Sequence, residues 1–217
     1  MAGKTAKSKI PSRPRGRPRP EETAQIERKL LAVALEEFLE HGYGDAAMAR
    51  IAQAAGGSKT TLYSRYPSKA ELFQALIFDQ VERASPETAL TSESGPLTLA
   101  AGLKSYARHM LRHSLQEDIR RLNQLIISES YRFPELGVAT TEKTAMGIRR
   151  ITDFIRETQA REGRRCRKPG AVAEAFIFMI RGWYLHVLLN NQEIALTDME
   201  QWVDRSVDAL LLSHREW

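Results

Sequence analysis

The sequence predicts an all-α protein of about nine helices, with an N-terminal three-helix helix-turn-helix domain and a larger C-terminal helical bundle. Three observations support this prediction. Apolar residues recur at helical spacing through most of the 217 residues, and no segment alternates as a strand does. The glycine pair Gly56-Gly57 separates two short helical patterns. A linker from Ser85 to Pro96 separates these from a series of longer helical patterns. We therefore expect a basic arm at 1–20, a first domain at 21–84 and a second at 96–217.

The positive charge of the chain is concentrated at its N-terminus. The formal net charge is +5, and seven of the 32 basic residues precede the first acidic residue, Glu21. The remainder carries 25 basic and 27 acidic residues. This distribution favours a polyanionic partner that is reached by the arm, and it disfavours a uniformly basic surface.

Residues 1–19 are rich in Pro, Gly, Ser, Lys and Arg, so we expect them to be disordered in isolation. The run Ser12-Arg-Pro-Arg-Gly-Arg-Pro-Arg19 contains Arg-Gly-Arg-Pro, which is similar to an AT-hook core. Extended arginines of this kind fit a narrow minor groove. Minor-groove contact by Arg15, Arg17 and Arg19 and a non-specific basic arm are about equally favoured.

The first domain should contain a long helix followed by three shorter ones. The long helix begins near Pro20 and ends at a left-handed glycine, Gly42. A second helix begins at Met48 and ends before the glycine pair. Ser58 is placed to cap a third helix that runs to Tyr66, and Ser68 with Glu71 forms a capping box that opens a fourth, ending near Arg83.

The third helix has a polar face suited to DNA, formed by Lys59, Thr60, Thr61, Tyr63 and Ser64. A solvated helical hairpin is the alternative interpretation. The segment AGGSKTTLYSRYPSKAELF, however, resembles the signature of TetR-family transcriptional regulators, and the resemblance extends from about Ile26 to Ile77. Gly57 replaces the usual Val of that signature, and Ala47 replaces the Ser or Thr that normally caps the second helix.

The resemblance implies a homodimeric DNA-binding regulator, most simply a repressor that a small-molecule effector releases from a palindromic operator. Lys59, Thr60, Thr61 and Tyr63 should contact or position bases. Ser58, Tyr66 and Lys69 should hold phosphates. An architectural or weakly specific DNA-binding protein driven by the basic arm is the alternative function.

The second domain should contain five helices, near 97–115, 117–131, 134–161, 170–190 and 197–214. The segment Ala175–Leu189 is apolar nearly all round, so both of its faces need covering. We expect one face to line the domain core and the other, with the last helix, to pack on a partner subunit; a larger core within one chain is the alternative. Arg132-Phe-Pro-Glu-Leu136 resembles a feature of AefR-like regulators.

Aromatic and polar residues on inward faces of this bundle predict a small-molecule site. Arg181 stands inside the apolar segment and needs an anion, for which Glu129, Glu174 or an effector carboxylate could serve. An ordinary core with an interface ion pair is at least as favoured. The candidate effector-binding residues are Leu122, Asn123, Ile126, Phe154, Phe176, Ile180, Trp183 and Tyr184.

Several function classes lack support in the sequence. His109, His113 and Glu117 have the spacing of a helical metal site, but a solvated polar face is the preferred interpretation. No catalytic motif or phosphate loop is present, so neither an enzyme nor a cofactor is predicted. The single cysteine, Cys166, excludes an intrachain disulfide and is most simply an incidental residue in a basic loop rather than a redox sensor. No uninterrupted apolar run reaches about 18 residues and no signal peptide is recognisable, so we predict a cytoplasmic protein without a membrane partner.

Overall fold

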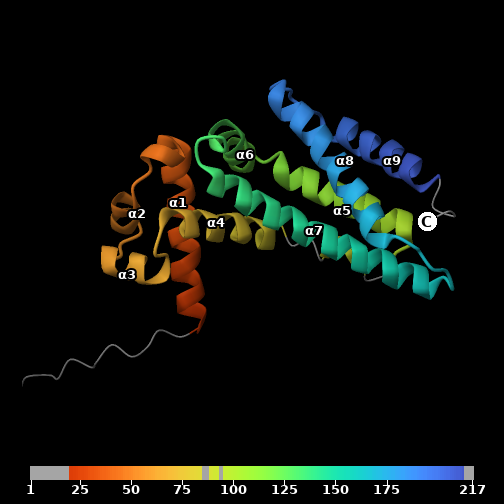
Figure 1. The fold of residues 1–217 in the computed structure, drawn as a ribbon, viewed down its shortest axis with the longest axis horizontal. Helices are drawn as coiled ribbons and strands as arrows, with labels where there is room; N and C mark the ends of the chain where they lie inside the picture. Colours follow the sequence, from red (N-terminus) through yellow and green to blue (C-terminus); the bar gives the residue numbers. More distant parts are fainter. Residues whose placement is uncertain (1–19, 85–87, 93–94, 213–217) are drawn as a thin grey trace, which may run out of the picture.

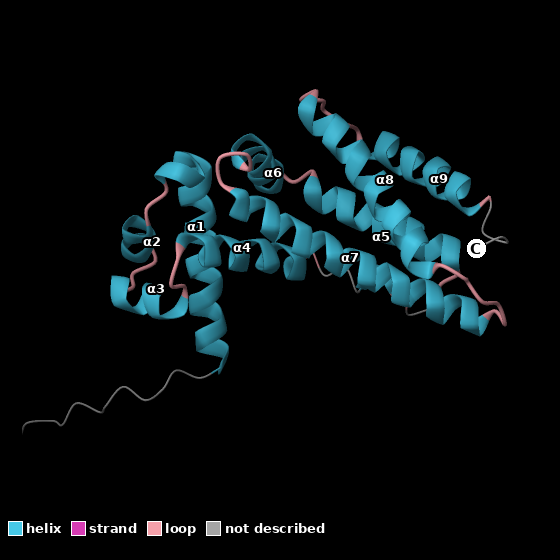
Figure 2. Ribbon diagram, in the orientation of Figure 1, coloured by secondary structure: helices cyan, strands magenta, loops and turns pink. Residues whose placement is uncertain are grey.

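The computed structural model describes residues 20–84, 88–92 and 95–212, and the side chains of residues 20–23 and 88 are left aside. Within these ranges the fold is entirely helical, as Figure 2 shows, and the all-α prediction is confirmed. The helices are α1 (Pro20–Asp45), α2 (Met48–Ala54), α3 (Lys59–Arg65), α4 (Lys69–Arg83), α5 (Leu99–Ser114), α6 (Glu117–Glu129), α7 (Pro134–Arg161), α8 (Pro169–Leu189) and α9 (Leu196–Leu211), with a short 3₁₀ helix at Thr88–Leu90.

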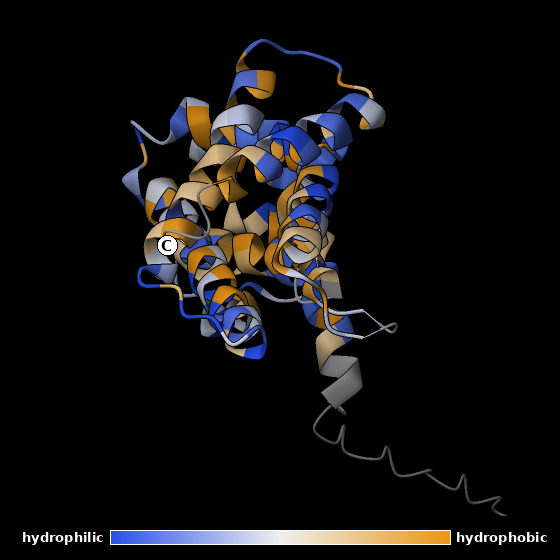
Figure 3. Ribbon diagram, turned by 90° about the vertical axis from the view of Figure 1, so that its right-hand side faces the viewer, coloured by the Kyte–Doolittle hydropathy of each residue, from blue (hydrophilic) through white to orange (hydrophobic). Residues whose placement is uncertain are grey.

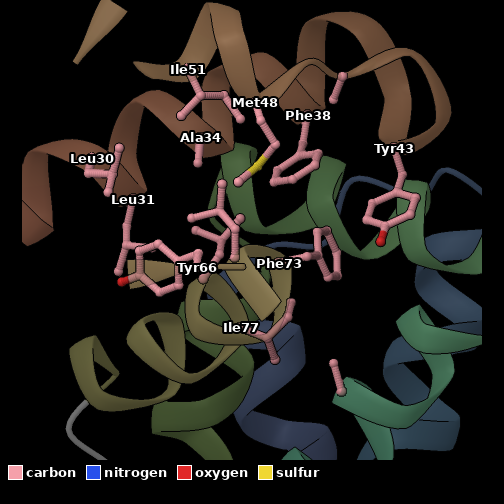
Figure 4. Close-up of a cluster of buried hydrophobic side chains, with 14 of the residues drawn as sticks. Leu30, Leu31, Ala34, Phe38, Tyr43, Met48, Ile51, Tyr66, Phe73 and Ile77 are labelled. Carbon is pink, nitrogen blue, oxygen red and sulfur yellow. The ribbon is translucent and has the colours of Figure 1, made fainter. Parts of the chain in front are cut away.

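Helices α1–α4 form a small domain at one end of the molecule, and α5 and α7–α9 form a larger one at the other, with α6 between them (Figure 1). The aromatic rings of Phe38, Tyr43 and Phe73 lie at the centre of the first core (Figure 4). Phe73 meets Phe38 and Tyr43 edge to face, at centroid distances of 5.2 and 5.3 Å. Such pairs add directional attraction to the area that burial removes from water. The core thereby fixes the start of α4 against the end of α1.

Gly42 makes the sharp turn that was predicted at the end of the long helix. Its backbone has φ 74° and ψ 169°, a conformation that essentially only glycine adopts. A Cβ at this position would also lie 2.8 Å from a carboxylate oxygen of Glu129. The helix therefore bends here, and Gly42, Tyr43 and Gly44 run close beneath α6.

Helices α3 and α4 begin with the side-chain caps that their sequences indicate, whereas α2 begins without one. Ser58 accepts a hydrogen bond from the backbone N–H of Thr61 at 3.1 Å, and Ser68 accepts one from Glu71 at 3.2 Å. Ala47, which has no side-chain cap to offer, instead donates its N–H to the Glu37 carboxylate on α1 at 2.8 Å. The same carboxylate accepts from Arg50, and these bonds hold the pKa of Glu37 below its ordinary value despite the opposing effect of burial. A carboxylate of α1 thus fixes the residue before α2 in place, although no side chain caps the N–H groups of α2 itself.

The second domain is built around the packing of α5, α7, α8 and α9. Figure 3 shows apolar segments where these helices face one another and hydrophilic colour in the loops at the edges. Phe154 and Phe176 lie in this core, and Trp183 on α8 stacks on Trp202 of α9 at 4.7 Å between ring centroids. A Cβ on Gly102 of α5 would lie 2.0 Å from the ring of Phe154, so only glycine allows α7 to approach this closely.

Helix α8 has apolar side chains on its exposed face as well as on the face that packs in the core. Phe178, Leu185 and Leu189 are 52%, 41% and 66% exposed, and together with Gly182 they follow one face of the helix. Within the described ranges, α8 is also the one helix long and apolar enough to cross a membrane by length and composition. No uninterrupted apolar run of about 18 residues was found in the sequence, and α8 does not contain one, because Glu174 and Arg181 interrupt it. Such a helix is also typical of a protein interior or an interface.

Tyr43 adds a specific contact to the packing of α4 on α7 and of α1 on α6 that joins the two domains, and it lies against the turn between α6 and α7. The Glu129 carboxylate at the end of α6 accepts from the backbone N–H groups of Tyr43 and Gly44 at 3.0 and 3.2 Å. The Tyr43 hydroxyl donates to Glu135 at 2.9 Å, and its ring meets Phe133 at 5.0 Å. Burial and the Glu135 carboxylate both raise the pKa of Tyr43, so this hydroxyl remains a donor at any physiological pH. The Phe-Pro-Glu segment therefore serves as a contact between domains.

Replacing Glu129 by Ala should destabilise the protein by about 1–3 kcal/mol, because two backbone donors in this joint lose their acceptor. Chemical denaturation followed by circular dichroism measures the change. Glu36→Ala, an exposed position on α1, is the control and should shift stability by about 0.5 kcal/mol or less. Equal stabilities of the two variants would show that the joint contributes nothing to folding.

Candidate nucleic-acid interface and ligand cavity

Helix α3 presents a polar, exposed face at the end of the molecule farthest from the second domain (Figure 1). It is anchored by Leu62, which is 4% exposed, while Tyr63 on the opposite side is 47% exposed. Ser58, Thr61 and Ser64 use hydrogen bonds within the helix: Ser58 and Thr61 oxygens lie 2.8 Å apart, and the Ser64 hydroxyl donates to the Thr61 carbonyl at 2.9 Å. These bonds stiffen the helix and leave its exposed polar side chains available to an external partner.

Two residues assigned to phosphate contact have internal partners, and both assignments need correction. Tyr66 is 7% exposed, and its hydroxyl donates to Glu27 at 3.0 Å, so its ring belongs to the core. Lys69 donates to the carbonyl oxygens of Tyr43, Gly44 and Ala46 at 2.6, 2.8 and 3.2 Å. An ammonium group has three donors, so these bonds account for all of them. Lys69 closes the end of α1 instead of offering charge to DNA.

The basic arm, with Arg15, Arg17 and Arg19, lies outside the described residues, and its role stays a prediction.

The larger domain contains a cavity of about 450 Å³ between α5, α6, α7 and α8. Its apolar wall includes Met110, Leu111, Ile177 and Leu188. The volume lies within the usual range for sites that hold small organic molecules. The remaining lining residues are Tyr106, Ser114, Asn123, Ile126, Ile127, Thr140, Lys143, Thr144, Gly147, Phe178, Ile180, Arg181, Gly182, Tyr184 and Leu185.

Half of the candidate effector residues line this cavity, namely Asn123, Ile126, Ile180 and Tyr184. The other four do not. Leu122 packs in the core of the first domain, beneath α1, because the buried face of α6 turns toward α1. Phe154 and Phe176 fill the core of the second domain, and Trp183 stacks on Trp202.

A polar stripe of α7 lines the cavity and was missed from the sequence. Thr140, Lys143, Thr144 and Gly147 follow one another at i, i+3, i+4 and i+7, so they share one face of the helix. A search for polar residues at helical spacing would have found this stripe. Apolar and aromatic residues alone do not mark this face of the helix.

The face of α5 that carries His109 and His113 packs against neighbouring helices. Ring nitrogen Nε2 of His109 meets the Ala84 carbonyl, and burial is the main cause that lowers the pKa of both histidines. The preferred interpretation, a solvated polar face, was therefore wrong for these two residues. In the part of the chain that the structure covers, no group of three or more His, Cys, Asp or Glu side chains could hold a metal ion.

Cys166 is a free, half-buried thiol in the basic loop between α7 and α8. It lines a second pocket with Arg156, Arg164, Arg165 and Arg167. The distinction between an incidental cysteine and a redox sensor is not decided by this geometry.

The comparisons with known proteins agree with this architecture. Residues 30–76 match the family of bacterial regulatory proteins named tetR, and residues 101–214 match the AefR-like transcriptional repressor C-terminal domain. The second match covers more than half of the chain. The chain belongs to the TetR family.

Several of its relatives are similar to it over nearly their whole length. The HTH-type transcriptional regulator TtgR of Pseudomonas putida is 26% identical over 204 residues, which cover 89% of this chain and 95% of TtgR. The Flavonoid-responsive Regulator FrrA is 30% identical in sequence and superposes with a TM-score of 0.65, over 87% of this chain and 96% of FrrA. A TetR-family structure from Mesorhizobium loti has a TM-score of 0.70 at 24% identity, over 87% and 96% of the two chains. The protein is a DNA-binding transcriptional regulator, and its relatives are regulators rather than enzymes.

Replacing Lys59 by Ala should weaken operator binding about tenfold or more, because Lys59 is an exposed cation on the polar face of α3. Fluorescence anisotropy with a labelled duplex measures the affinity. Arg165→Ala removes the same charge from the loop between α7 and α8, which lies at the end of the molecule opposite α3 (Figure 1), and should change affinity less than twofold. Equal losses in both variants would mean that only overall charge matters and that α3 does not contact DNA.

Proposed function

We propose that this protein is a homodimeric repressor that binds a palindromic operator through α3 and is released when a small molecule occupies the cavity of the second domain. The observation that carries the proposal is the pairing of these two features in one chain. An exposed polar helix stands at one end, and a partly open cavity lies between helices that also contact the first domain through Tyr43.

The contact residues proposed for DNA are Lys59, Thr60 and Tyr63, which are exposed on α3 and for which no internal hydrogen bond is recorded in the described part of the chain. Ser58, Thr61 and Ser64 add exposed oxygen atoms at the edges of the same face. A helix N-terminus that carries such groups is suited to phosphate and base edges in the major groove. Thymine methyl groups and adenine or guanine N7 atoms are the natural partners of Thr60 and Lys59.

The homodimer is proposed from the exposed apolar stripe of α8, formed by Phe178, Gly182, Leu185 and Leu189. Among the described residues, no neighbouring atom lies within 4 Å of where a Cβ on Gly182 would stand, so a second helix can approach closely there. Two-fold pairing of this stripe would bury apolar area that is otherwise open to water. It would also present two α3 helices to one duplex.

Selection of bound duplexes from a random pool tests the proposal. The selected sites should be palindromes with half-sites about one helical turn apart, or a multiple of it, because each subunit presents one reading helix. A duplex with one half-site should bind at least about tenfold more weakly. Selection of non-palindromic or unrelated sequences would overturn the proposal.

The rival function is an architectural or weakly specific DNA-binding protein driven by the basic arm. Deleting residues 1–19 should reduce the dependence of log affinity on log salt by up to about six, since each of the seven basic residues in this segment adds about 0.9 when it neutralises a phosphate. The preference for operator over random duplex should persist. Loss of the preference together with the arm would favour the rival function and would place specificity outside α3.

A further inference from the structure

The cavity between α5 and α8 contains two cations that face an otherwise uncharged wall. Lys143 comes from α7 and Arg181 from α8, and both line the cavity. No Asp or Glu lines it. No ion pair or hydrogen bond to either cation is recorded within the described ranges.

The acidic residues nearest in position to these cations either bond to other groups or lie outside the cavity. Glu129 accepts the backbone N–H groups of Tyr43 and Gly44. Glu142, the neighbour of Lys143, accepts from Gln74 at 2.5 Å. Glu174, the only carboxylate on α8, is exposed and does not line the cavity. Of the three anions considered for Arg181 from the sequence, an external carboxylate is the one that the geometry leaves available.

Burial lowers the pKa of both cations, and the charge of Arg181 lowers that of Lys143 further. Burial and the positive charge of Arg181 lower the pKa of Lys143 to about 8. Burial also lowers the pKa of Arg181, which nevertheless stays charged. A pKa displaced in this direction is the sign of a cation that lacks a counter-charge. An anion brought between the two groups would reverse the effect.

Three hydroxyl groups of the cavity already donate their protons to backbone carbonyls, so they cannot donate to a carboxylate and leave that role to the two cations. Thr140 donates to the Leu136 carbonyl at 2.9 Å, and Thr144 donates to the Thr140 carbonyl at 2.8 Å. The Tyr184 hydroxyl donates to the Ser114 carbonyl at 2.9 Å. These oxygens can accept hydrogen bonds but cannot donate them. The charged donors that a ligand meets are therefore Lys143 and Arg181.

We infer that the effector is an amphipathic organic anion whose carboxylate lies between Lys143 and Arg181 and whose apolar body fills the cavity toward Met110, Ile177 and Leu188. A planar carboxylate matches the paired N–H groups of a guanidinium, and the ammonium supplies a second charge-assisted bond. A hydrophobic cation of the same shape meets two like charges and is excluded. This inference rests on the proposed function in treating the cavity as the effector site.

Calorimetric titration of the full-length protein without DNA tests the inference directly. The probes are naphthalene-2-carboxylate and decanoate, each compared with its neutral primary amide and with a primary ammonium analogue of the same skeleton. At least one carboxylate should bind about tenfold more tightly than its amide, and the ammonium compounds should not bind measurably. Equal affinity of acid and amide, binding of the ammonium compounds, or no binding of either acid would overturn the inference.

Two variants place the binding in this cavity. Lys143→Met and Arg181→Met should each weaken carboxylate binding about tenfold or more while leaving amide binding unchanged. Lys29→Met, at an exposed position on α1, is the charge-matched control and should bind as the parent does. Thermal unfolding supplies a second readout, because replacing an unpaired buried cation by an apolar side chain should raise Tm. A fall in Tm together with unaltered carboxylate affinity would show that Lys143 has an internal counter-charge, and would overturn the inference.

The DNA complex separates this inference from the function on which it rests. Carboxylate binding that Lys143→Met abolishes, without any release of operator duplex, would refute the proposed function and leave the anion site standing. Release of the duplex by neutral or cationic compounds, with no effect of carboxylates, would support the proposed function and refute the anion site.

Discussion

The structure depends on the contacts that Tyr43 makes with the end of α6 and the start of α7. Three different interactions meet at this residue: a carboxylate accepts its backbone N–H, a second carboxylate accepts its hydroxyl, and Phe133 packs on its ring. The same ring is edge-on to Phe73 at the start of α4. Tyr43 therefore contacts both domains, and together with the packing of α4 on α7 and of α1 on α6 it fixes the position of α3 relative to the cavity.

Gly42 is what makes these contacts geometrically possible. Its positive φ lifts the chain out of α1 and directs the next two N–H groups at Glu129. The same carboxylate lies 2.8 Å from where a side chain would begin, so two independent constraints select glycine at this position. The positive φ of Gly42 could be predicted from the sequence, because glycine often ends a helix in this way. The close approach of Glu129 could not, because Glu129 lies 87 positions away in the chain.

Features set by neighbouring residues were predictable from the sequence, and features set by distant contacts were not. Caps such as Ser58 and Ser68 act within one turn, so the helices of the first domain begin where the sequence indicates. The assignment of Tyr66 and Lys69 failed because their partners, Glu27 and the end of α1, lie far away in the chain. The same holds for Leu122, since periodicity shows that α6 has a buried face but not that α1 covers it. Lys143 was missed because a polar stripe has the same pattern in sequence whether water or another helix lies over it.

Helix α7 extends without interruption for 28 residues from the turn after α6 to the far end of the second domain, which makes it a rod of about 42 Å. Its N-terminal turn touches Tyr43, and the stripe from Thr140 to Gly147 begins less than two turns farther on. A rod of this length that tilts by about 3° moves its tip by about 2 Å, close to the rise of one residue. If α7 tilts as one rigid rod, a molecule that displaces it beside Thr140 also moves its contact with Tyr43 and its far contact with α8.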